Sequence, residues 1–374
     1  MDDIIATDTH YHIERRGRFI IAELLGQHGI LSTSAWGGGQ REDVRYIVNH
    51  QSCEGGGHDA RAAVFHQLNE REYHQQVCAE LTLAPEAVAL MGTAANMSYA
   101  ATASEEYAEL RVRAVVTAGV EGNAGRAGDP TRWHEGEDGW SKVDPNAGTI
   151  NIILLINWPL TPAALARTVI TMTESKTAVL QELAVSSRYS EHLATGTGTD
   201  QYCVAAPIDE SKRPKSNAGH HAKLGELIGR TVLRAMREAL RWQNGLEPSY
   251  TRGLVHALKR FGFTEESCLA ALEKRLAGDR YNLLEKNSKA VFYEPQVAAA
   301  AYACTAIWDR VQYGTLSSTL ATTVLRQQAA TLASCLAAKP DSWPECWQEL
   351  AFDESEPLAM IYDALALGWE LKWN

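Results

Sequence analysis

The stretch 149–157, TINIILLIN, decides the fold, because it reads as a β-strand that is apolar on both faces. Side chains alternate between the two faces of a strand, so a strand of this kind has to be covered on both sides. A helix is predicted to follow. Thr161 is typical of an N-cap, Pro162 suits the first helical position, and apolar residues then recur at helical spacing up to Leu183. The stretch therefore predicts a central strand of a sheet that is packed with helices.

Other segments of the first part of the chain also have the composition of strands. They are residues 18–25, 29–33, 43–49, 87–93, 111–118 and 202–206. The helical segments between them have uneven lengths, which favours a mixed sheet over a regular barrel. We expect the α+β class, with a mixed β-sheet core packed with helices.

The composition changes near residues 244–248, and nearly every later segment has helical periodicity. A chain of 374 residues has room for two or three domains. The sequence thus predicts a first domain over residues 1–245 and a C-terminal all-α domain of four or five helices over residues 250–374.

The charge balance limits the class of partner. Lys and Arg number 35 and Asp and Glu 46, which gives a net charge of −11 without a basic run, so no nucleic-acid partner is expected. The longest apolar stretch is far shorter than the roughly 20 residues that span a bilayer, so no membrane partner is expected. The first residues do not resemble a secretory signal, and seven Cys without a C-x-x-C pattern favour reduced thiols, so we expect a cytoplasmic protein. A homo-oligomer is compatible with these features.

A D-x-H-x-H string near the start, Asp8, His10 and His12, is a candidate metal site. Histidines two apart on a strand face the same side and can share one metal ion. The string is also similar to the opening of metal-dependent amidohydrolase barrels. The chain, however, lacks eight strand–helix units, and a polar terminus without function is the alternative interpretation.

A glycine-rich loop, residues 119–129, follows the predicted strand 111–118 and includes Asn123 and Asp129. Its backbone N–H groups could face a ligand. It continues into a polar segment with Trp133 and Trp140, which offer flat apolar faces to a large ligand. A surface loop anchored by these indoles is the alternative.

Two further segments carry polar residues that could belong to a functional site. Lys176 lies on the apolar stripe of the first helix, two residues after Glu174, so its ammonium either reaches solvent or is buried as a base or anion holder. The loop 194–200, ATGTGTD, places Thr197, Thr199 and Asp200 just before a strand. A capped tight turn is its alternative interpretation.

A second helix is predicted to begin near residue 222. His221 stands at its start, where backbone N–H groups are unpaired, with Lys223 and Glu226 on its polar face. Such a helix start can hold an anion or an oxyanion, or His221 merely caps the helix. Gly225 and Gly229 in the helix interior indicate that something packs very close to it.

Seven strings, read in order, resemble the adenosylcobinamide amidohydrolase (CbiZ) family of corrinoid salvage. They are residues 31–35 with 37–39, 90–95, 116–119 with 122–124 and 128–129, 148–152, 174–178, 194–200 and 221–229. The resemblance covers about residues 13–242. It leaves out the helical tail and the first dozen residues.

The resemblance implies a hydrolase that cleaves the amide between the aminopropanol arm and the corrin ring of adenosylcobinamide or a related corrinoid, giving adenosylcobyric acid. The corrinoid is then the substrate, no cofactor is expected, and no catalytic metal is expected. The alternatives are a metal-dependent amidohydrolase that uses Asp8, His10 and His12, and a non-catalytic corrinoid-binding protein.

Amide hydrolysis needs an attacking oxygen, a base and donors for the oxyanion. An imidazole or carboxylate is the expected base, threonine hydroxyls the nucleophile or oxyanion donors, and lysines the groups that stabilise developing charge. The expected catalytic residues are His221, Asp129, Glu174, Lys176, Thr197, Thr199 and Lys223. The expected substrate-binding residues are Asn123, Asn151, Asp200, Glu226, Trp133 and Trp140, with the two Trp in contact with the face of the corrin.

Overall fold

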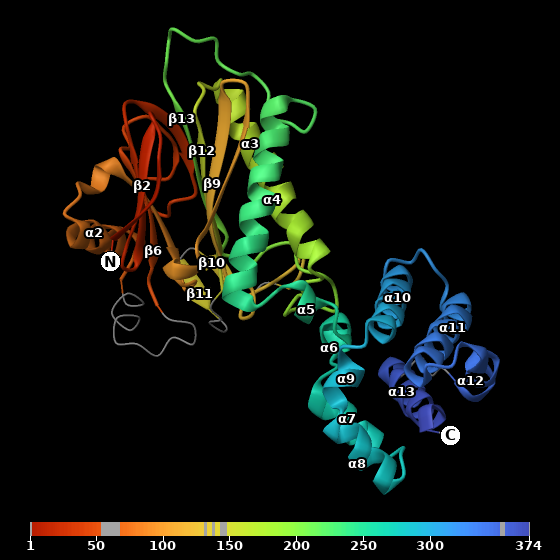
Figure 1. Ribbon diagram of the computed structural model, residues 1–374. Coiled ribbons are helices and arrows are strands. Elements are labelled where there is room, and N and C mark those ends of the chain that lie inside the picture. Colours follow the sequence, from red (N-terminus) through yellow and green to blue (C-terminus); the bar gives the residue numbers. More distant parts are fainter. Residues whose placement is uncertain are drawn as a thin grey trace. The chain divides into compact units, whose positions relative to one another are not determined.

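The computed structural model describes residues 2–53, 68–130, 133–136, 139–142, 148–351 and 356–373, with only the backbone described for Asp2, 133–136 and 139–142. Contacts between Cα atoms divide the chain into two units, Met1–Leu246 and Glu247–Asn374. Figure 1 shows the first unit as sheets flanked by helices and the second as helices alone. No helix of the described residues is long and apolar enough to cross a membrane.

The first unit contains two mixed sheets. One has the order β1 (Asp2–Thr7), β2 (Tyr11–Arg16), β3 (Phe19–Leu24), β6 (Tyr46–Gln51) and β7 (Val88–Thr93). The other has the order β5 (Gly39–Arg41), β4 (His28–Ser32), β13 (Gln201–Pro207), β12 (Ile150–Ile156), β9 (Leu110–Ala118) and β8 (Ala101–Tyr107). In each sheet one neighbouring pair is parallel, β6 with β7 and β12 with β13. The predicted α+β class is confirmed, with two sheets where the sequence suggested one.

The two sheets pack face to face, and helices cover the outer faces. Side chains from both sheets form one apolar core, with Ile47 and Met91 from the first and Ile153 and Cys203 from the second. Helix α2 (Glu70–Leu81) covers the first sheet. Helices α3 (Pro162–Glu182) and α4 (Lys223–Asn244) cover the second. All seven residues of β12 are buried, which confirms the prediction of a central strand covered on both faces.

Local signals account for the helix boundaries. The Thr161 hydroxyl accepts the Ala164 N–H at 3.2 Å and caps α3, as predicted. Helix α4 ends at Gly245, whose φ of 63° is in the left-handed region that glycine tolerates. A Cβ on Gly225 would lie 2.1 Å from the Gly219 carbonyl oxygen, so this glycine permits a close backbone approach to the start of α4.

The first dozen residues, left outside the resemblance, form β1 and most of the β1–β2 hairpin at the edge of the first sheet. Sequence reasoning missed this hairpin because β2 ends in Glu14, Arg15 and Arg16, which hide the apolar alternation of Tyr11 and Ile13. The predicted loop around Trp133 and Trp140 likewise contains a hairpin. It consists of β10 (Trp133–Gly136) and β11 (Gly139–Lys142).

Every secondary-structure element described in the second unit is helical, as predicted. The α-helices are α5 (Pro248–Thr251), α6 (Leu254–Leu258), α7 (Glu265–Glu273), α8 (Gly278–Lys286), α9 (Ser288–Phe292), α10 (Pro295–Gln312), α11 (Ser318–Ala337), α12 (Trp343–Glu349) and α13 (Pro357–Trp373). The described residues thus contain more helices than the four or five expected, because several are short. They enclose an apolar core of their own, which includes Phe292, Cys304 and Ile361.

Candidate active site

Several strand ends meet at one end of the two sheets. Strand β9 ends opposite the start of β12, and β13 starts beside it, since Ala118 pairs with Ile150 and Asn151 with Gln201. Strand β7 ends at the same place, because Gly92 N donates to Gln201 Oε1 at 2.8 Å. The segments that follow or precede these strands therefore converge here. We call this region the strand-end cluster and define it by Asn123, Asp129, Lys176 and the loop 194–200.

A buried ion pair lies at the centre of the strand-end cluster. Lys176 reaches from α3 to the Asp200 carboxylate, and only 11% of the Lys176 side chain and 19% of the Asp200 side chain are exposed. Asp200 Oδ1 also accepts the Thr197 hydroxyl at 2.5 Å and the Ile150 N–H at 3.1 Å. Of the two interpretations of Lys176, the buried one is correct. The carboxylate joins α3, β12 and the Thr-Gly loop at one point.

The two threonines of this loop differ in exposure. Thr197 is 1% exposed, so its hydroxyl serves the Asp200 carboxylate rather than a ligand. Thr199 is exposed, and its hydroxyl lies 2.8 Å from both Gly148 O and Thr149 Oγ1. Asn123 Nδ2 approaches the same hydroxyl at 3.3 Å. Thr199 and Asn123 therefore present polar groups on the accessible side of the ion pair.

The glycine-rich loop 119–129 and the Thr-Gly loop 194–200 are bonded to each other. Gly125 N donates to Gly196 O at 2.9 Å, and Thr195 N donates to Gly125 O at 2.8 Å. Asp129 fixes its own loop by accepting Ser187 Oγ at 2.5 Å and Arg126 N at 2.8 Å. Burial raises the pKa of Asp129, but these hydrogen bonds outweigh it and hold the pKa below its ordinary value. Asp129 is therefore an ionised anchor of the loop.

A buried amide network connects the two sheets beside the ion pair. Asn151 Nδ2 donates to Asn49 Oδ1 at 2.8 Å and to Gly92 O at 3.0 Å, and Asn49 Nδ2 donates to Thr117 Oγ1 at 2.8 Å. Asn151 is fully buried, and its Oδ1 has no hydrogen-bond partner among the described residues. Asn151 thus holds the two sheets together, and its expected contact with substrate stays a prediction. Sequence reasoning missed Asn49, whose signal was an amide inside an otherwise apolar strand.

The structure places Lys223 and Glu226 away from the strand-end cluster, and His221 is exposed in the turn before α4. Lys223 Nζ pairs with Glu226 and lies 4.7 Å from the ring centroid of Tyr107, at the end of the β8–β9 hairpin opposite Ala118. Nine residues of β9, about 30 Å at about 3.4 Å per residue, separate the two ends. Lys223 and Glu226 therefore lie at the end of the sheet opposite the Thr-Gly loop, and the catalytic role of His221 stays a prediction.

The direction of α4 explains this separation. The helix runs along the sheet for 22 residues and reaches the strand-end cluster with its last residue, where Val120 N donates to Asn244 Oδ1 at 3.2 Å. Its first turn is consequently at the far end (Figure 1). Glu174, two residues before Lys176 on α3, meets the segment that precedes α4, because its Oε2 lies 2.7 Å from His220 Nε2.

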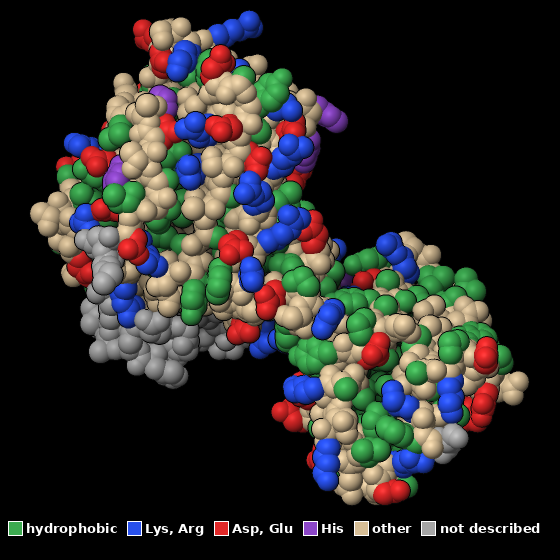
Figure 2. Space-filling view, in the orientation of Figure 1, with side chains coloured by type: hydrophobic (Ala, Val, Ile, Leu, Met, Phe, Trp, Pro, Cys, Tyr) green, Lys and Arg blue, Asp and Glu red, His purple; other side chains and the backbone are tan. Residues whose placement is uncertain are grey.

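The outer face of α4 is a row of ion pairs. Its arginines pair with carboxylates of α4, α3 and β8: the pairs are Arg230–Glu226, Arg234–Glu105, Arg237–Glu182 and Arg241–Glu238. Figure 2 shows blue and red side chains interspersed over the face of the first unit in view, without a large patch of either sign. The polar face of α4 is therefore a solvated surface. The indole side chains of Trp133 and Trp140 lie outside the described side chains.

The N-terminal D-x-H-x-H string is divided between a turn and a strand. Asp8 is paired with Arg111 at 2.6 Å, and only 4% of its side chain is exposed. Burial raises the pKa of Asp8, but the bond from Arg111 and the other hydrogen bonds outweigh it and the pKa is lowered. His10 lies in the turn before β2, and His12 Nδ1 is 3.0 Å from Thr7 Oγ1. Within the described ranges, no group of three or more His, Cys, Asp or Glu could hold a metal ion.

Comparisons with known proteins agree with the extent of the first unit. A family model described as adenosylcobinamide amidohydrolase (CbiZ) matches residues 2–248, which includes the N-terminal hairpin. An uncharacterized protein of Methanocaldococcus jannaschii is 34% identical over 255 residues, which cover 64% of this chain and 94% of that relative. The match ends where the helical unit begins.

Proposed function

The chain belongs to the adenosylcobinamide amidohydrolase family, and we propose from this membership that it hydrolyses the amide between the aminopropanol arm and the corrin ring of adenosylcobinamide. Water adds across the C–N bond, which gives adenosylcobyric acid and free aminopropanol. One observation carries the proposal. Six of the seven strings that resemble the family lie at or beside the strand-end cluster, and the seventh, residues 221–229, packs against residues 174–178 where Gly229 lies beside Ser175.

The chemistry is assigned to the Lys176–Asp200 pair and its accessible neighbours. The Asp200 carboxylate takes the proton of the attacking water, and the Lys176 ammonium stabilises the negative oxygen of the tetrahedral intermediate. The Thr199 hydroxyl, which donates to Gly148 O in the structure, turns its one proton to that oxygen as a second donor. The proton held by Asp200 then passes to the leaving amine. Thr197 orients Asp200, and Asp129 holds the loop.

The test uses purified full-length protein with adenosylcobinamide. Mass spectrometry is expected to find a corrinoid with one amide converted to a carboxylate, together with free aminopropanol. Asp200→Asn is expected to lower turnover by about a hundredfold or more, as the loss of a general base does. His221→Ala is the matched control, and turnover near that of the unchanged protein is expected. The reverse pattern would move the chemistry to the start of α4.

The same assay separates the alternatives. Tight corrinoid binding without any product would support a non-catalytic binding protein. Dialysis against EDTA is expected to leave turnover unchanged, since the proposed groups hold and move protons without a metal. Turnover that EDTA abolishes and zinc restores would support the metal-dependent alternative.

A further inference from the structure

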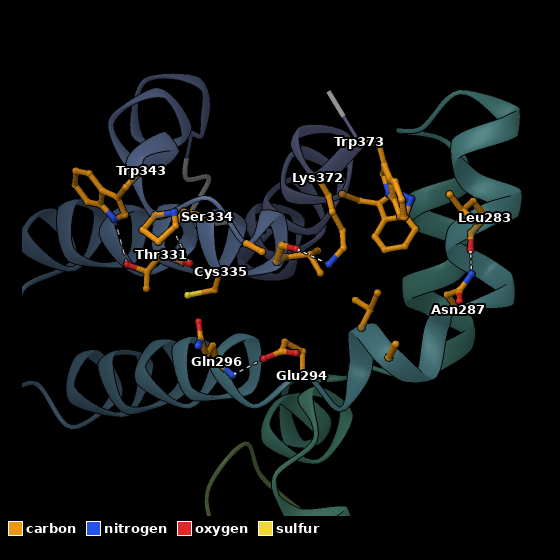
Figure 3. Close-up of a pocket in the computed structure, with 16 residues that line it drawn as sticks. Leu283, Asn287, Glu294, Gln296, Thr331, Ser334, Cys335, Trp343, Lys372 and Trp373 are labelled. Atoms are coloured by element: carbon orange, nitrogen blue, oxygen red, sulfur yellow. Dashed lines mark hydrogen bonds between the residues drawn. The ribbon is translucent and has the colours of Figure 1, made fainter.

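The helical unit contains a cavity of about 820 Å³, to which the proposed reaction gives no role. It lies between the start of α10, the second half of α11 and the end of α13, with α8 and α9 at one side (Figure 3). Small-molecule sites commonly have volumes of about 300–1,000 Å³. The cavity therefore has room for a ligand of nucleoside size.

Indole rings line this cavity in two places. Trp343 is fixed beside α11, because its Nε1 donates to Thr331 Oγ1 at 3.1 Å. Trp369 and Trp373 of α13 form an edge-to-face pair with ring centroids 5.5 Å apart. Trp369 is buried, whereas 45% of Trp373 is exposed. An exposed indole at a cavity offers an apolar face that a flat ligand can cover.

Two opposite charges face the same space. The Lys372 ammonium donates to Leu336 O at 3.2 Å, and the described residues provide no carboxylate within ion-pair distance of it. The Glu294 carboxylate, at the start of α10, accepts the Gln296 N–H over a long 3.4 Å. Figure 3 shows Lys372 and Glu294 facing the cavity from different helices. Each therefore has hydrogen-bonding capacity left for a ligand.

The cysteine in the wall does not indicate covalent chemistry. Burial, and after it the negative charge of Glu294, raises the pKa of the Cys335 thiol. A thiol with a raised pKa stays protonated and is a poor nucleophile. The cavity consequently has the features of a binding site.

We propose that this cavity binds an uncharged planar nitrogen heterocycle of nucleoside size. Its ring covers the exposed face of Trp373, a ring or exocyclic N–H donates to Glu294, and a ring nitrogen or carbonyl oxygen accepts from Lys372. A flat anion pairs with the Lys372 ammonium but is repelled by the Glu294 carboxylate, and a flat cation pairs with Glu294 but is repelled by Lys372. A neutral ligand with both donors and acceptors satisfies both walls.

The experiment is calorimetric titration of the full-length protein with adenosine. One site per chain is expected, and Trp373→Ala is expected to weaken binding by about tenfold or more, as the loss of one base–aromatic stack does. Trp242→Ala is the matched control, since this indole is 57% exposed in the first unit, and unchanged affinity is expected. Circular dichroism establishes that both variants are folded.

Charged flat probes test the two charges. Benzoate and tryptamine are each expected to bind at least about tenfold more weakly than adenosine, because each meets one like charge. Glu294→Gln is expected to reduce the difference in affinity between adenosine and benzoate. Lys372→Met is expected to reduce the difference in affinity between adenosine and tryptamine. The proposal is overturned if adenosine does not bind up to millimolar concentration, if Trp373→Ala leaves its affinity unchanged, or if benzoate binds as tightly as adenosine. None of these results depends on amide hydrolysis.

Discussion

The two partners of the buried ion pair are predicted to contribute unequally to stability. Asp200 accepts hydrogen bonds from Lys176, from the hydroxyl and the N–H of Thr197, and from the Ile150 N–H. Lys176 has Asp200 as its one carboxylate partner among the described residues. Removing the carboxylate therefore leaves a largely buried ammonium and three donors without an acceptor. Removing the ammonium leaves a carboxylate that still has three donors.

The magnitudes follow from this count. Breaking a buried pair so that one charge remains costs about 3–5 kcal/mol, and the partial exposure of both side chains favours the lower end. Asp200→Ala is thus expected to lower the free energy of unfolding by about 3–4 kcal/mol. Lys176→Met removes one charge-assisted hydrogen bond, which is worth about 1.5–3 kcal/mol. Because three donors still bind the Asp200 carboxylate, this substitution is expected to lower the free energy of unfolding by about 1.5–2 kcal/mol. In the double variant the costs should be less than additive.

Hydrogen exchange at amides of β12 and β13 is the suitable assay, because these strands are buried in the first unit and are expected to exchange only when that unit unfolds. The readout is therefore independent of unfolding of the helical unit. The opening free energy of these amides gives the stability of each variant. A cost for Lys176→Met equal to or above that for Asp200→Ala would refute the reasoning. So would strict additivity in the double variant.

Three other perturbations give measurable outcomes. A Cβ on Gly196 would lie 2.5 Å from the Asp200 carboxylate and 2.8 Å from the Lys176 ammonium, so Gly196→Ala is expected to lower turnover at least tenfold. Gly29→Ala is the control, because a Cβ there would have nothing within 4 Å, and turnover should be unchanged. Gly225→Ala should destabilise the first unit by about 1–3 kcal/mol, because its Cβ would overlap the Gly219 carbonyl oxygen. The Cβ of Gly229→Ala would make an ordinary contact with Ser175 Oγ at 3.5 Å, so this variant should be more stable by up to about 1 kcal/mol. Urea unfolding measures both changes. The lowered pKa of Asp129 means that its contribution to stability is complete above its ordinary value of 3.8 and is lost as the pH falls through the native pKa. The stability difference between the unchanged protein and Asp129→Asn should therefore shrink below about pH 4, and a difference that grows with acid would contradict the assignment.

Local features were readable from the sequence. The apolar run of β12, the cap at Thr161 and the stripe of α3 depend on neighbouring residues and on periodicity, and the structure has them where the pattern indicates. The order of the family-like strings also identified the segments that form the strand-end cluster. These signals are local because backbone preference and amphipathic period act within one element.

Only the tertiary structure decided which of these segments meet. Lys176 reaches Asp200 across 24 residues, and Asn49 reaches Asn151 across 102, because strand order and sheet packing bring them together. Periodicity does not specify strand order. His221 looked equally suited to catalysis in the sequence, yet α4 starts at the far end of the sheet, and it is the last residues of the helix, Gln243 and Asn244, that reach the glycine-rich loop. The chemistry of each side chain is fixed by its type, but its partners are fixed by the direction of the element that carries it.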